Sequence, residues 1–424
     1  MKRVSFRIIT TLLAIGIASL IIYALSHAGK SSKGPIENAM TYTGDVVKDI
    51  EQKLIVEQRG EKREDKLKWL NEYAASKKLL LHPTKMLFGA FDNNTKDGFE
   101  SIVSLEDSLQ TTFPLISIYT AWGEKPEERF PTEKVKNILT LGSLPVITWE
   151  PWLSDFQEED YPVQREGDER NRNGMKDVAA GVYDAYVNKW AINARKIEKP
   201  IFLRFGHEMN DGYRYPWGPH NNTPDEFIAA WKHVHDIFVK QGAKNVIWMW
   251  SPHPAYEFKE FYPGDNYVDY IGVGVLNYGN IAAWSKWWSF REIFGKYYRK
   301  ATAYNKPIMI TEFGSLAVGG SRAKWYTDAL DSLPMKYPLV KSVLFFHFSE
   351  DNTTTQQTLN WYIKSDKPVT NAIIKTVAKW KDLDLNEIER TRPKFTDPDS
   401  TVKVKHFKHK GTSSVNPDSV KPKG

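Results

Sequence analysis

The chain has 424 residues, of which 41% are hydrophobic and 26% are charged, as in an ordinary folded globular protein. It contains no cysteine, which excludes disulfides, thiolate metal ligands and thiol nucleophiles. Much of the formal net charge of +6 lies at the chain ends, and no basic face is evident elsewhere, so we expect no nucleic-acid partner. We expect residues 383–424 to form a polar, basic and disordered tail.

The N-terminus has the pattern of an export signal. Residues 1–3 (Met-Lys-Arg) are a positive start, residues 8–25 carry no charge, and residues 26–28 (Ser-His-Ala) offer small side chains at the two positions that a signal peptidase reads. The apolar run is longer than the core of most signal peptides and close to the shortest membrane span. Residues 1–28 therefore fit either a cleaved signal peptide or an uncleaved membrane anchor. In both cases we expect an extracytoplasmic protein that is periplasmic, secreted or anchored to the cell membrane.

Residues 29–80 are expected to form a polar linker followed by amphipathic helices, because Leu67, Leu70 and Ala74 have the spacing of one helical face. From residue 81 onward, short apolar runs alternate with helix-patterned stretches. The clearest of these helices begins at the capping box of residues 223–226 (Thr-Pro-Asp-Glu) and is expected to end before Gly242.

Eight apolar runs are predicted to be strands. Most are nearly continuous in apolar residues, which is typical of strands buried on both faces. They are Met86–Phe91, Leu115–Trp122, Pro145–Glu150, Ile201–His207, Val246–Trp250, Tyr270–Leu276, Ile308–Glu312 and Val343–His347. The rhythm predicts an α/β protein with a single (β/α)8 TIM barrel over residues 81–382. A doubly wound open sheet is the alternative, but its nucleotide-binding forms need a glycine-rich loop after the first strand, and residues 90–94 are Ala-Phe-Asp-Asn-Asn.

Two carboxylates stand where catalytic groups lie in such a barrel, at the C-terminal ends of strands. Glu208 follows the fourth predicted strand and Glu312 ends the seventh. Because these strands are three places apart in a ring of eight, their end residues can face each other across the mouth of the barrel. Glycosidic cleavage requires such a pair, with one group protonating the departing oxygen while the other stabilises or attacks the anomeric carbon. Glu150 and Glu350 also lie at strand ends, and we interpret them as ordinary loop residues.

Two motifs around these carboxylates resemble glycoside hydrolase family 26. Residues 204–210 (Arg-Phe-Gly-His-Glu-Met-Asn), with 215–218 (Tyr-Pro-Trp-Gly), resemble its acid/base segment, and residues 310–314 (Ile-Thr-Glu-Phe-Gly) resemble its nucleophile segment. The resemblance implies a retaining mechanism in which Glu208 is the general acid/base and Glu312 the nucleophile. It also implies that Tyr278, after the sixth strand, lies beside the nucleophile, and we expect this tyrosine to donate a hydrogen bond to Glu312.

Further residues are expected to bind substrate. Arg204 should point inward and pair with a carboxylate, because an unpaired buried charge is too costly. His207 is expected to hydrogen-bond the nucleophile or a sugar hydroxyl, and His347 lies where family members usually carry a stacking tryptophan. The candidate stacking platforms, among which we favour Trp217 because it closes the acid/base loop, are Trp149, Trp152, Trp217, Trp250, Trp284, Trp287 and Trp288.

No cofactor and no metal site is expected. His233 and His235 are two apart on a predicted helix, so their rings point to different faces. The pair His207-Glu208 lacks the second histidine, four residues after the first, that a zinc protease helix carries.

The sequence therefore predicts an endo-acting retaining β-glycoside hydrolase that cleaves β-1,4 bonds in mixed-linkage β-glucan or β-mannan type polysaccharide. Mannan-cleaving members of this family carry the motif Trp-Phe-Trp-Trp-Gly where residues 213–218 are Tyr-Arg-Tyr-Pro-Trp-Gly. The motif of this chain looks closer to that of members that cut β-1,3-1,4-glucan. The alternative is a non-catalytic carbohydrate-binding barrel that acts in exopolysaccharide processing or export. Its expected signature is the loss of one carboxylate, and both are present. An extracellular scaffold that uses the charged segment 154–176 would leave the paired glutamates unexplained.

Overall fold

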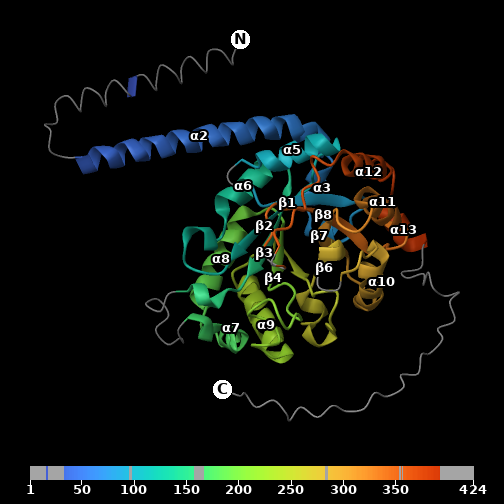
Figure 1. The fold of residues 1–424 in the computed structure, drawn as a ribbon. Helices are drawn as coiled ribbons and strands as arrows, with labels where there is room; N and C mark the ends of the chain where they lie inside the picture. The colour runs from blue at the N-terminus through green and yellow to red at the C-terminus, as the bar shows by residue number, and fades with distance from the viewer. Residues whose placement is uncertain are drawn as a thin grey trace, which may run out of the picture.

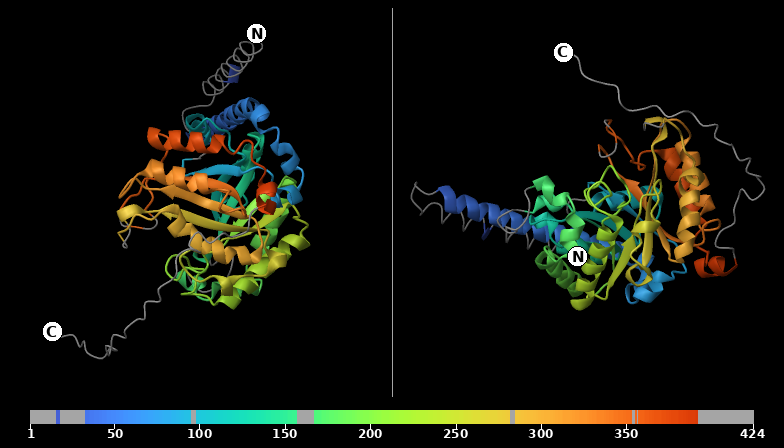
Figure 2. Two further views of the ribbon diagram at one scale, coloured as in Figure 1. Left: turned by 90° about the vertical axis from the view of Figure 1, so that its right-hand side faces the viewer. Right: turned by 90° about the horizontal axis from the view of Figure 1, so that it is seen from below.

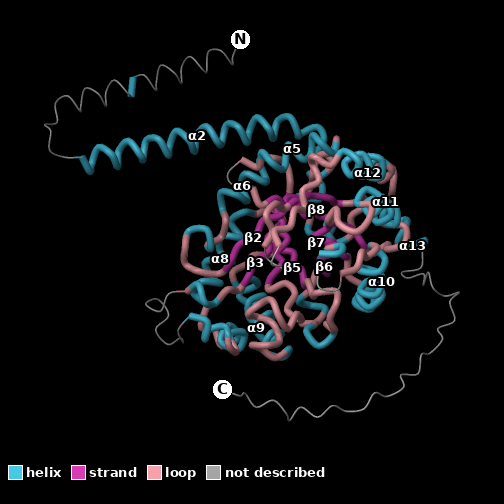
Figure 3. Tube along the Cα trace, viewed as in Figure 1, coloured by secondary structure: helices cyan, strands magenta, loops and turns pink. Residues whose placement is uncertain are grey.

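Eight parallel strands close into a barrel in the order β1 to β8, surrounded by helices (Figures 1 and 3). The computed structural model describes residues 16–17, 33–94, 98–156, 167–281, 285–352, 355 and 357–391. The strands are Leu87–Asp92 (β1), Leu115–Ala121 (β2), Leu144–Glu150 (β3), Ile201–Phe205 (β4), Val246–Trp250 (β5), Tyr270–Asn277 (β6), Ile308–Ser315 (β7) and Val340–His347 (β8). All eight predicted strands are present, and the closed ring confirms the predicted TIM barrel.

Side chains alternate between the inside of the barrel and the layer beneath the helices. The interior is filled by large apolar side chains, which include Leu115, Val146, Phe202, Ile247 and Met309. The outer faces of the same strands join a larger cluster with the surrounding helices. Burial on both faces explains why the strands are nearly continuous in apolar residues instead of alternating with polar ones.

The helices that cover the barrel follow the strands in sequence. They are α5 (Glu100–Leu109), α6 (Thr132–Thr140), α7 (Gly174–Ala179), α8 (Asp184–Ile197), α9 (Pro224–Lys240), α10 (Phe290–Ala301), α11 (Arg322–Ser332) and α12 (Lys367–Ala378). Helix α9 confirms the predicted capping box, since the Thr223 side chain accepts from the Glu226 amide and the Glu226 side chain accepts from the Thr223 amide. Gly242 follows with a φ of +74°, as expected after a helix end.

Three helices precede the barrel: α2 (Lys33–Leu67), α3 (Leu70–Ala74) and α4 (Lys77–Leu81). Helix α2 already begins at Lys33, where we expected a polar linker, and its N-terminal half extends beyond the barrel wall (Figures 1 and 2). Its C-terminal half is held by Arg63, which is buried and bonds to Glu106 at 2.6 Å. No helix in the described part of the chain is both long and apolar enough to cross a membrane, and the expected leader lies outside that part except for residues 16–17.

The C-terminal boundary differs from our expectation of a polar tail from residue 383. Helix α13 (Leu385–Thr391) packs on the bottom of the barrel, where the Leu385 amide bonds to the Thr84 carbonyl at 2.8 Å. Lys341, in β8, forms a 2.6 Å ion pair with Glu389. The apolar Leu385 and the paired Glu389 give this short polar stretch enough contacts to be ordered. Residues 392–424 lie outside the described residues.

Candidate active site

Glu208 and Glu312 line one cavity of about 600 Å³ at the C-terminal ends of the strands. The cavity lies among the loops that follow β4, β5, β6 and β7. Its other lining residues include Arg214, His253, Tyr256, Tyr278 and Trp288. The structure thus brings the two predicted catalytic carboxylates together, both of them more than nine-tenths buried.

A β-bulge directs Glu312 into the barrel mouth. In the ladder between β6 and β7, Val273 pairs with Ile310 and the next residue, Gly274, pairs with Glu312. Thr311 is therefore an extra residue, and the bulge reverses the side-chain alternation after it. Without the bulge, the inward direction of Met309 would turn the side chain of Glu312 outward, toward the helices.

The backbone around Glu208 is unusual. Both Gly206 and Glu208 have left-handed backbones, with φ of +49° and +53°. A left-handed glutamate costs on the order of 1 kcal/mol, and such strain is typical of functional sites. The Glu208 amide donates a 2.7 Å hydrogen bond to the Ser251 carbonyl just after β5, which holds the turn and presents the carboxylate to the cavity.

Gly274 gives a measure of how close the two carboxylates are. A Cβ atom added to this glycine would lie 3.4 Å from Glu312 Oε2 and 3.5 Å from Glu208 Oε1. These two oxygens are therefore no more than about 7 Å apart, a limit that includes the ~5–5.5 Å separation of a retaining pair. The absence of a side chain at Gly274 also leaves the floor between them open.

Glu312 is held by two donors. Arg204 Nη1 lies 2.6 Å from Glu312 Oε1, and Arg204 Nε bonds to Ser251 Oγ at 2.9 Å. This contact confirms the prediction that Arg204 points inward and pairs with a carboxylate. The Tyr119 hydroxyl donates to the same oxygen at 3.0 Å. Burial and the nearby Glu312 raise the pKa of Tyr119, so its hydroxyl stays protonated and remains a donor.

The sequence did not single out Tyr119, which donates to Glu312 from β2. The hydrogen bond expected from Tyr278 stays a prediction. Tyr278 is half-buried in the cavity wall, where its ring meets the edge of Trp361 at 5.0 Å.

The surroundings of Glu208 favour its protonated form. Burial and the neighbouring Glu312 raise its pKa, whereas His253, Arg214 and Arg204 act in the opposite direction, and the net direction is upward. Arg214 Nη1 lies 3.3 Å from Glu208 Oε2. The raised pKa is what a general acid needs near neutral pH. Arg214 is a second residue that the sequence did not single out.

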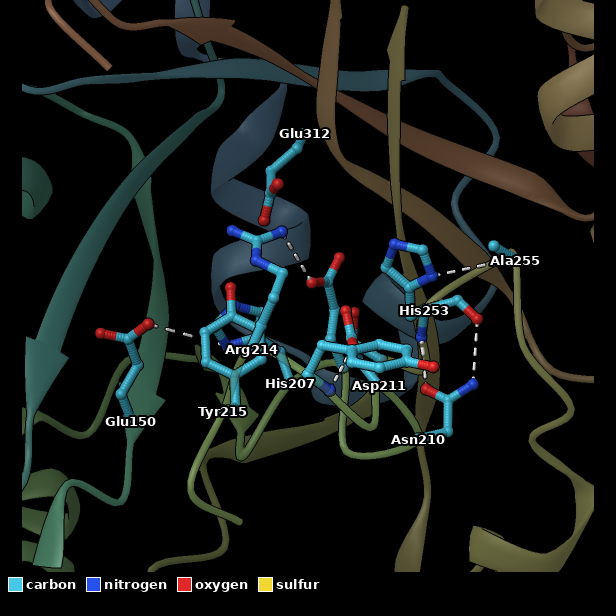
Figure 4. A network of polar contacts seen from close by, with 12 residues as sticks. Glu150, His207, Asn210, Asp211, Arg214, Tyr215, His253, Ala255 and Glu312 are labelled. Atoms are coloured by element: carbon cyan, nitrogen blue, oxygen red, sulfur yellow. Dashed lines mark hydrogen bonds and ion pairs between the residues drawn. The ribbon is translucent and has the colours of Figure 1, made fainter. Parts of the chain in front are cut away.

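A third carboxyl group lies beside the pair. Burial raises the pKa of Glu150 to about 7, although the Trp152 indole donates to it at 3.3 Å. Glu150 Oε1 lies 3.9 Å from His207 Nδ1, and His207 Nε2 shares a 3.0 Å hydrogen bond with the Tyr215 hydroxyl (Figure 4). Our interpretation of Glu150 as an ordinary loop residue is therefore wrong, because it belongs to the polar network of the site.

His207 does not bond to the nucleophile in this structure, and a bond to a sugar hydroxyl stays a prediction. Its ring is buried, and its hydrogen-bond partner is Tyr215 instead of the nucleophile. Burial, together with Arg204 and Arg214, lowers the pKa of His207 well below its usual value, so the ring is neutral. A neutral His207 supports the acid/base loop without adding a charge to it.

Three of the predicted stacking platforms are buried. Trp149 and Trp250 have no exposed surface, and Trp217 is 1% exposed. Trp149 packs on Trp190 at 4.3 Å beneath the helices, because its neighbour in β3, Thr148, takes the inward position. Trp250 likewise points outward, next to the inward-facing Met249. These tryptophans support the barrel wall, and a sugar cannot stack on them in this structure.

Trp217 closes the acid/base loop from the inside. Its indole donates to the His207 carbonyl at 2.7 Å, and its ring stacks on Tyr215 at 4.7 Å. Of the other candidates, Trp288 lines the cavity and remains partly exposed, Trp152 and Trp287 are half-buried, and Trp284 lies outside the described residues.

His347 is also placed away from the cavity. It is 1% exposed, its Nδ1 accepts from the Ile363 amide at 3.2 Å, and the ring of Tyr362 covers it at 4.0 Å. His347 ends β8 on the outward side, since its neighbour Phe346 faces the inner rim. It therefore packs against the loop after β8, in contrast to the prediction that it contacts substrate.

One group of three side chains has the spacing of metal ligands within the described residues. Glu208, Asp211 and His253 offer ligand atoms that all lie within 4.8 Å of one another. An ion held there would occupy a Glu208 oxygen, and the predicted role of Glu208 as general acid needs its carboxyl for a proton. The expectation of no metal stays a prediction.

A closed (β/α)8 barrel with two buried carboxylates facing one cavity at its C-terminal end is the arrangement of a glycoside hydrolase. Comparison with known proteins agrees. The model of glycosyl hydrolase family 26 matches residues 154–376, and the chain belongs to this family.

Similar proteins include Endoglucanase H of Acetivibrio thermocellus, which is 35% identical over 220 residues, or 50% of this chain and 22% of that protein. A mannan endo-1,4-beta-mannosidase of Bacillus subtilis is 33% identical over 81 residues, or 17% of this chain and 22% of that one. The chain thus spans only about a fifth of the length of these two relatives.

Solved structures share the fold at low identity. The structure of GH26C from Muricauda sp. MAR_2010_75 has a TM-score of 0.53 at 17% identity and covers 74% of this chain and 90% of that one. A GH26 beta-mannanase from Bacteroides ovatus has a TM-score of 0.51 at 15% identity, with 84% and 99% covered. At these identities the likeness shows the barrel fold alone.

Proposed function

We propose that this chain is an endo-acting retaining β-glycoside hydrolase that uses Glu208 as general acid/base and Glu312 as nucleophile. The observation that carries the proposal is the position of both carboxylates within 3.5 Å of one point above Gly274. A non-catalytic sugar-binding barrel would not require this closeness, nor a raised pKa on one carboxyl of the pair.

The proposed reaction has two displacements. Glu312 attacks the anomeric carbon while Glu208 gives its proton to the glycosidic oxygen, so the C–O bond to the leaving sugar breaks as the bond to Glu312 forms. The negative charge of Glu312 is then consumed, which removes one of the causes that raise the pKa of Glu208. Glu208 next takes a proton from water, and this water replaces Glu312 at the same carbon.

The ion pair with Arg204 and the hydrogen bond from Tyr119 fit this role of Glu312. Both donors contact Oε1, which leaves Oε2 as the oxygen nearer to the point above Gly274. We therefore assign the attack to Oε2. The donors on Oε1 fix the orientation of the carboxylate.

The proposed substrate is a β-1,4-linked stretch of mixed-linkage β-glucan or of a β-mannan type polysaccharide. Support comes from the similarity to an endoglucanase and to an endo-mannosidase. The sequence motif of residues 213–218 favours the mixed-linkage β-glucan as substrate. A screen of barley β-glucan, lichenan, glucomannan, galactomannan and laminarin by release of reducing ends separates these substrates.

Substitution of the two carboxylates tests the proposal. Glu208→Ala and Glu312→Ala should each lower kcat by about 10²-fold or more with the fold retained, as judged by thermal unfolding. Azide should restore turnover of Glu208→Ala on aryl glycosides with good leaving groups. These substrates form the glycosyl-enzyme without an acid, and azide attacks that intermediate without the general base that water needs. Glu133→Ala, a surface carboxylate of α6, is the control. Substantial activity in Glu312→Ala would remove that residue from the nucleophile role.

The stereochemical course is a separate test of the retaining mechanism. Proton NMR during the first turnovers should show the β-anomer of the new reducing end before mutarotation. Initial formation of the α-anomer would refute the double displacement while leaving the assignment of two catalytic carboxylates intact.

We also infer that residues 1–28 direct the chain out of the cytoplasm, because a positive start precedes an uncharged run of membrane-like length. Fractionation of cells that express the full chain should find it outside the cytoplasm. Retention of the unprocessed chain in the cytosol would contradict this inference, and mass spectrometry of the N-terminus distinguishes a cleaved signal from an anchor.

A further inference from the structure

A groove of about 540 Å³ lies at the N-terminal end of the barrel, opposite the catalytic cavity. Phe88, near the start of β1, and Thr112, shortly before β2, belong to its wall. Its described lining includes three exposed lysines, Lys66, Lys85 and Lys381, and no aspartate or glutamate. We call this cavity the basic groove, and its volume is that of a site for a small ligand or for part of a polymer.

The positive charge of the basic groove is only partly compensated. Its lysines come from the end of α2, the segment before β1 and the segment after α12, and none forms an ion pair with a carboxylate in the described part of the chain. The C-terminal ends of α2, α5 and α12 meet at the groove (Figure 1). Each helix end contributes about half a negative charge, so together they offset about half of the charge of the lysines. The groove therefore attracts anions.

Aromatic rings form much of the floor of the basic groove. Trp380 is 5% exposed, its indole donates to the Leu333 carbonyl at 3.2 Å, and its ring centroid lies 6.3 Å from that of Phe88. Trp69 is half-buried, and Lys85 Nζ lies 5.2 Å from the centre of its ring. Flat apolar surfaces beside ammonium groups suit a ring that carries a negative charge, such as a sugar acid, better than a bare inorganic anion.

The segments that carry Trp69 and Lys85 are fastened to each other. The Tyr73 hydroxyl in α3 shares a 2.7 Å hydrogen bond with Thr84 Oγ1 and accepts from the Thr84 amide at 3.2 Å. The ring of Tyr73 also meets that of Trp69 edge to face, at 5.7 Å between centroids. Because Trp69 precedes α3 and Lys85 follows Thr84, one wall of the basic groove is preorganised for a ligand.

We propose that the basic groove is a non-catalytic binding site for an anionic polysaccharide whose sugars carry carboxylates. The three lysines bind the carboxylates, and the C–H faces of the sugar rings pack on Trp69 and Phe88. The Gln110 amide and the Thr112 hydroxyl, which also line the groove, bond to sugar hydroxyls. This inference goes beyond the proposed function, because the bound polymer is acidic and lies at the opposite end of the barrel. It would hold the enzyme on an acidic matrix while the catalytic cavity stays accessible.

Binding to immobilised polyuronates tests the proposal without hydrolysis. The full chain, in a non-ionic detergent, is applied to biotinylated polygalacturonate and alginate in biolayer interferometry, with biotinylated dextran as the neutral reference. Lys66→Gln/Lys85→Gln/Lys381→Gln should raise Kd for the polyuronates about tenfold or more, because each exposed ion pair contributes modestly and three are lost.

A charge-matched variant separates this site from general attraction between a basic protein and a polyanion. It removes the same number of exposed lysines from α6, α8 and α9, as Lys134→Gln/Lys189→Gln/Lys240→Gln. Its Kd should stay within about twofold of wild type, and a rise equal to that of the groove variant would overturn the proposal. Both variants should hydrolyse an aryl glycoside as wild type does, so a failure of the proposed function appears separately from a failure of binding.

Two further measurements test the nature of the ligand. Trp69→Leu should raise Kd about threefold or more, because a sugar ring loses its platform. A galacturonate hexamer should displace the enzyme at a concentration about tenfold lower than sulfate at equal ionic strength. Equal displacement by sulfate would show a simple anion site and overturn the proposal, as would an unchanged Kd in either groove variant. Failure of wild type to bind both polyuronates would also overturn it, including the case in which the same lysines bind phosphatidylglycerol vesicles instead.

Discussion

Replacement of Arg214 by methionine is expected to move the alkaline limb of the pH profile upward. The acid form of Glu208 is lost as pH rises through its pKa, and this loss sets the alkaline limb of kcat/KM. Arg214 is one of the cations that lower the pKa of Glu208, while burial, its largest influence, and Glu312 raise it. Removal of this cation therefore raises the pKa further, and the acid form persists to higher pH.

The contact geometry sets the size of this shift. Arg214 Nη1 lies 3.3 Å from Glu208 Oε2, and the two side chains are 28% and 6% exposed. A single contact of this length with one partner near solvent is worth about 1 kcal/mol, which corresponds to ~0.7 of a pH unit. The guanidinium carbon of Arg214 also lies 5.1 Å from the centre of the Tyr215 ring, and methionine replaces the charged group by an unbranched apolar side chain of similar length.

The measurement is kcat/KM from about pH 4 to pH 9 on the preferred polysaccharide, for wild type, Arg214→Met and Arg214→Lys. The lysine variant keeps the charge and should lie between the other two. Arg195→Met is a matched control, because Arg195 is at the end of α8 and bonds to the Gln241 carbonyl there. An alkaline limb that stays in place or moves to lower pH would refute this account of Glu208.

Three further substitutions separate catalytic from structural roles. Tyr119→Phe removes the 3.0 Å donor to Glu312 while keeping the ring, so kcat/KM should fall about 10- to 100-fold with little change in melting temperature; unaltered kinetics would exclude this hydroxyl from the site. Trp217→Ala leaves a cavity behind the acid/base loop and should cost about 3–5 kcal/mol of unfolding free energy in urea. Arg63→Met leaves the buried Glu106 without its ion-pair partner. It should lower the unfolding free energy by about 3–5 kcal/mol in the same assay, with kcat of the folded enzyme unchanged. A stability loss below 1 kcal/mol would contradict the last two.

The barrel, and the meeting of Glu208 and Glu312 in one cavity, could be predicted because both follow from the positions of the strands. Runs such as residues 246–250 are apolar throughout, a pattern that only a strand buried on both faces requires, and eight of them in an α/β rhythm suggest a closed ring. Glu208 and Glu312 lie where such strands end. The bulge at Thr311, which points Glu312 inward, leaves no sign in the sequence, so the inward direction of this carboxylate is known from the structure alone.

The neighbours of the two carboxylates could be predicted only in part from the alternation of side chains along the strands. Arg204 is level with Thr148 in β3 and, through it, with Tyr119 in β2, so all three face inward. The same alternation places Trp149 outward and would have identified Tyr119 as the neighbour of Arg204. Arg214 lies in a loop, where no periodic pattern predicts which residues meet. Its contact with Glu208 could therefore not be predicted from the sequence.

The charges of the site explain why a cation beside the acid is compatible with catalysis. Arg204 and Arg214 are the two guanidinium groups of this network, and Glu150, Asp211 and Glu312 are carboxyl groups near Glu208. Ionisation of Glu208 adds a further negative charge to a buried cavity. Burial and the neighbouring Glu312 therefore favour the acid form, although Arg214 acts in the opposite direction. During cleavage the proton leaves Glu208 as positive charge develops on the sugar, so the added negative charge appears when it is stabilising.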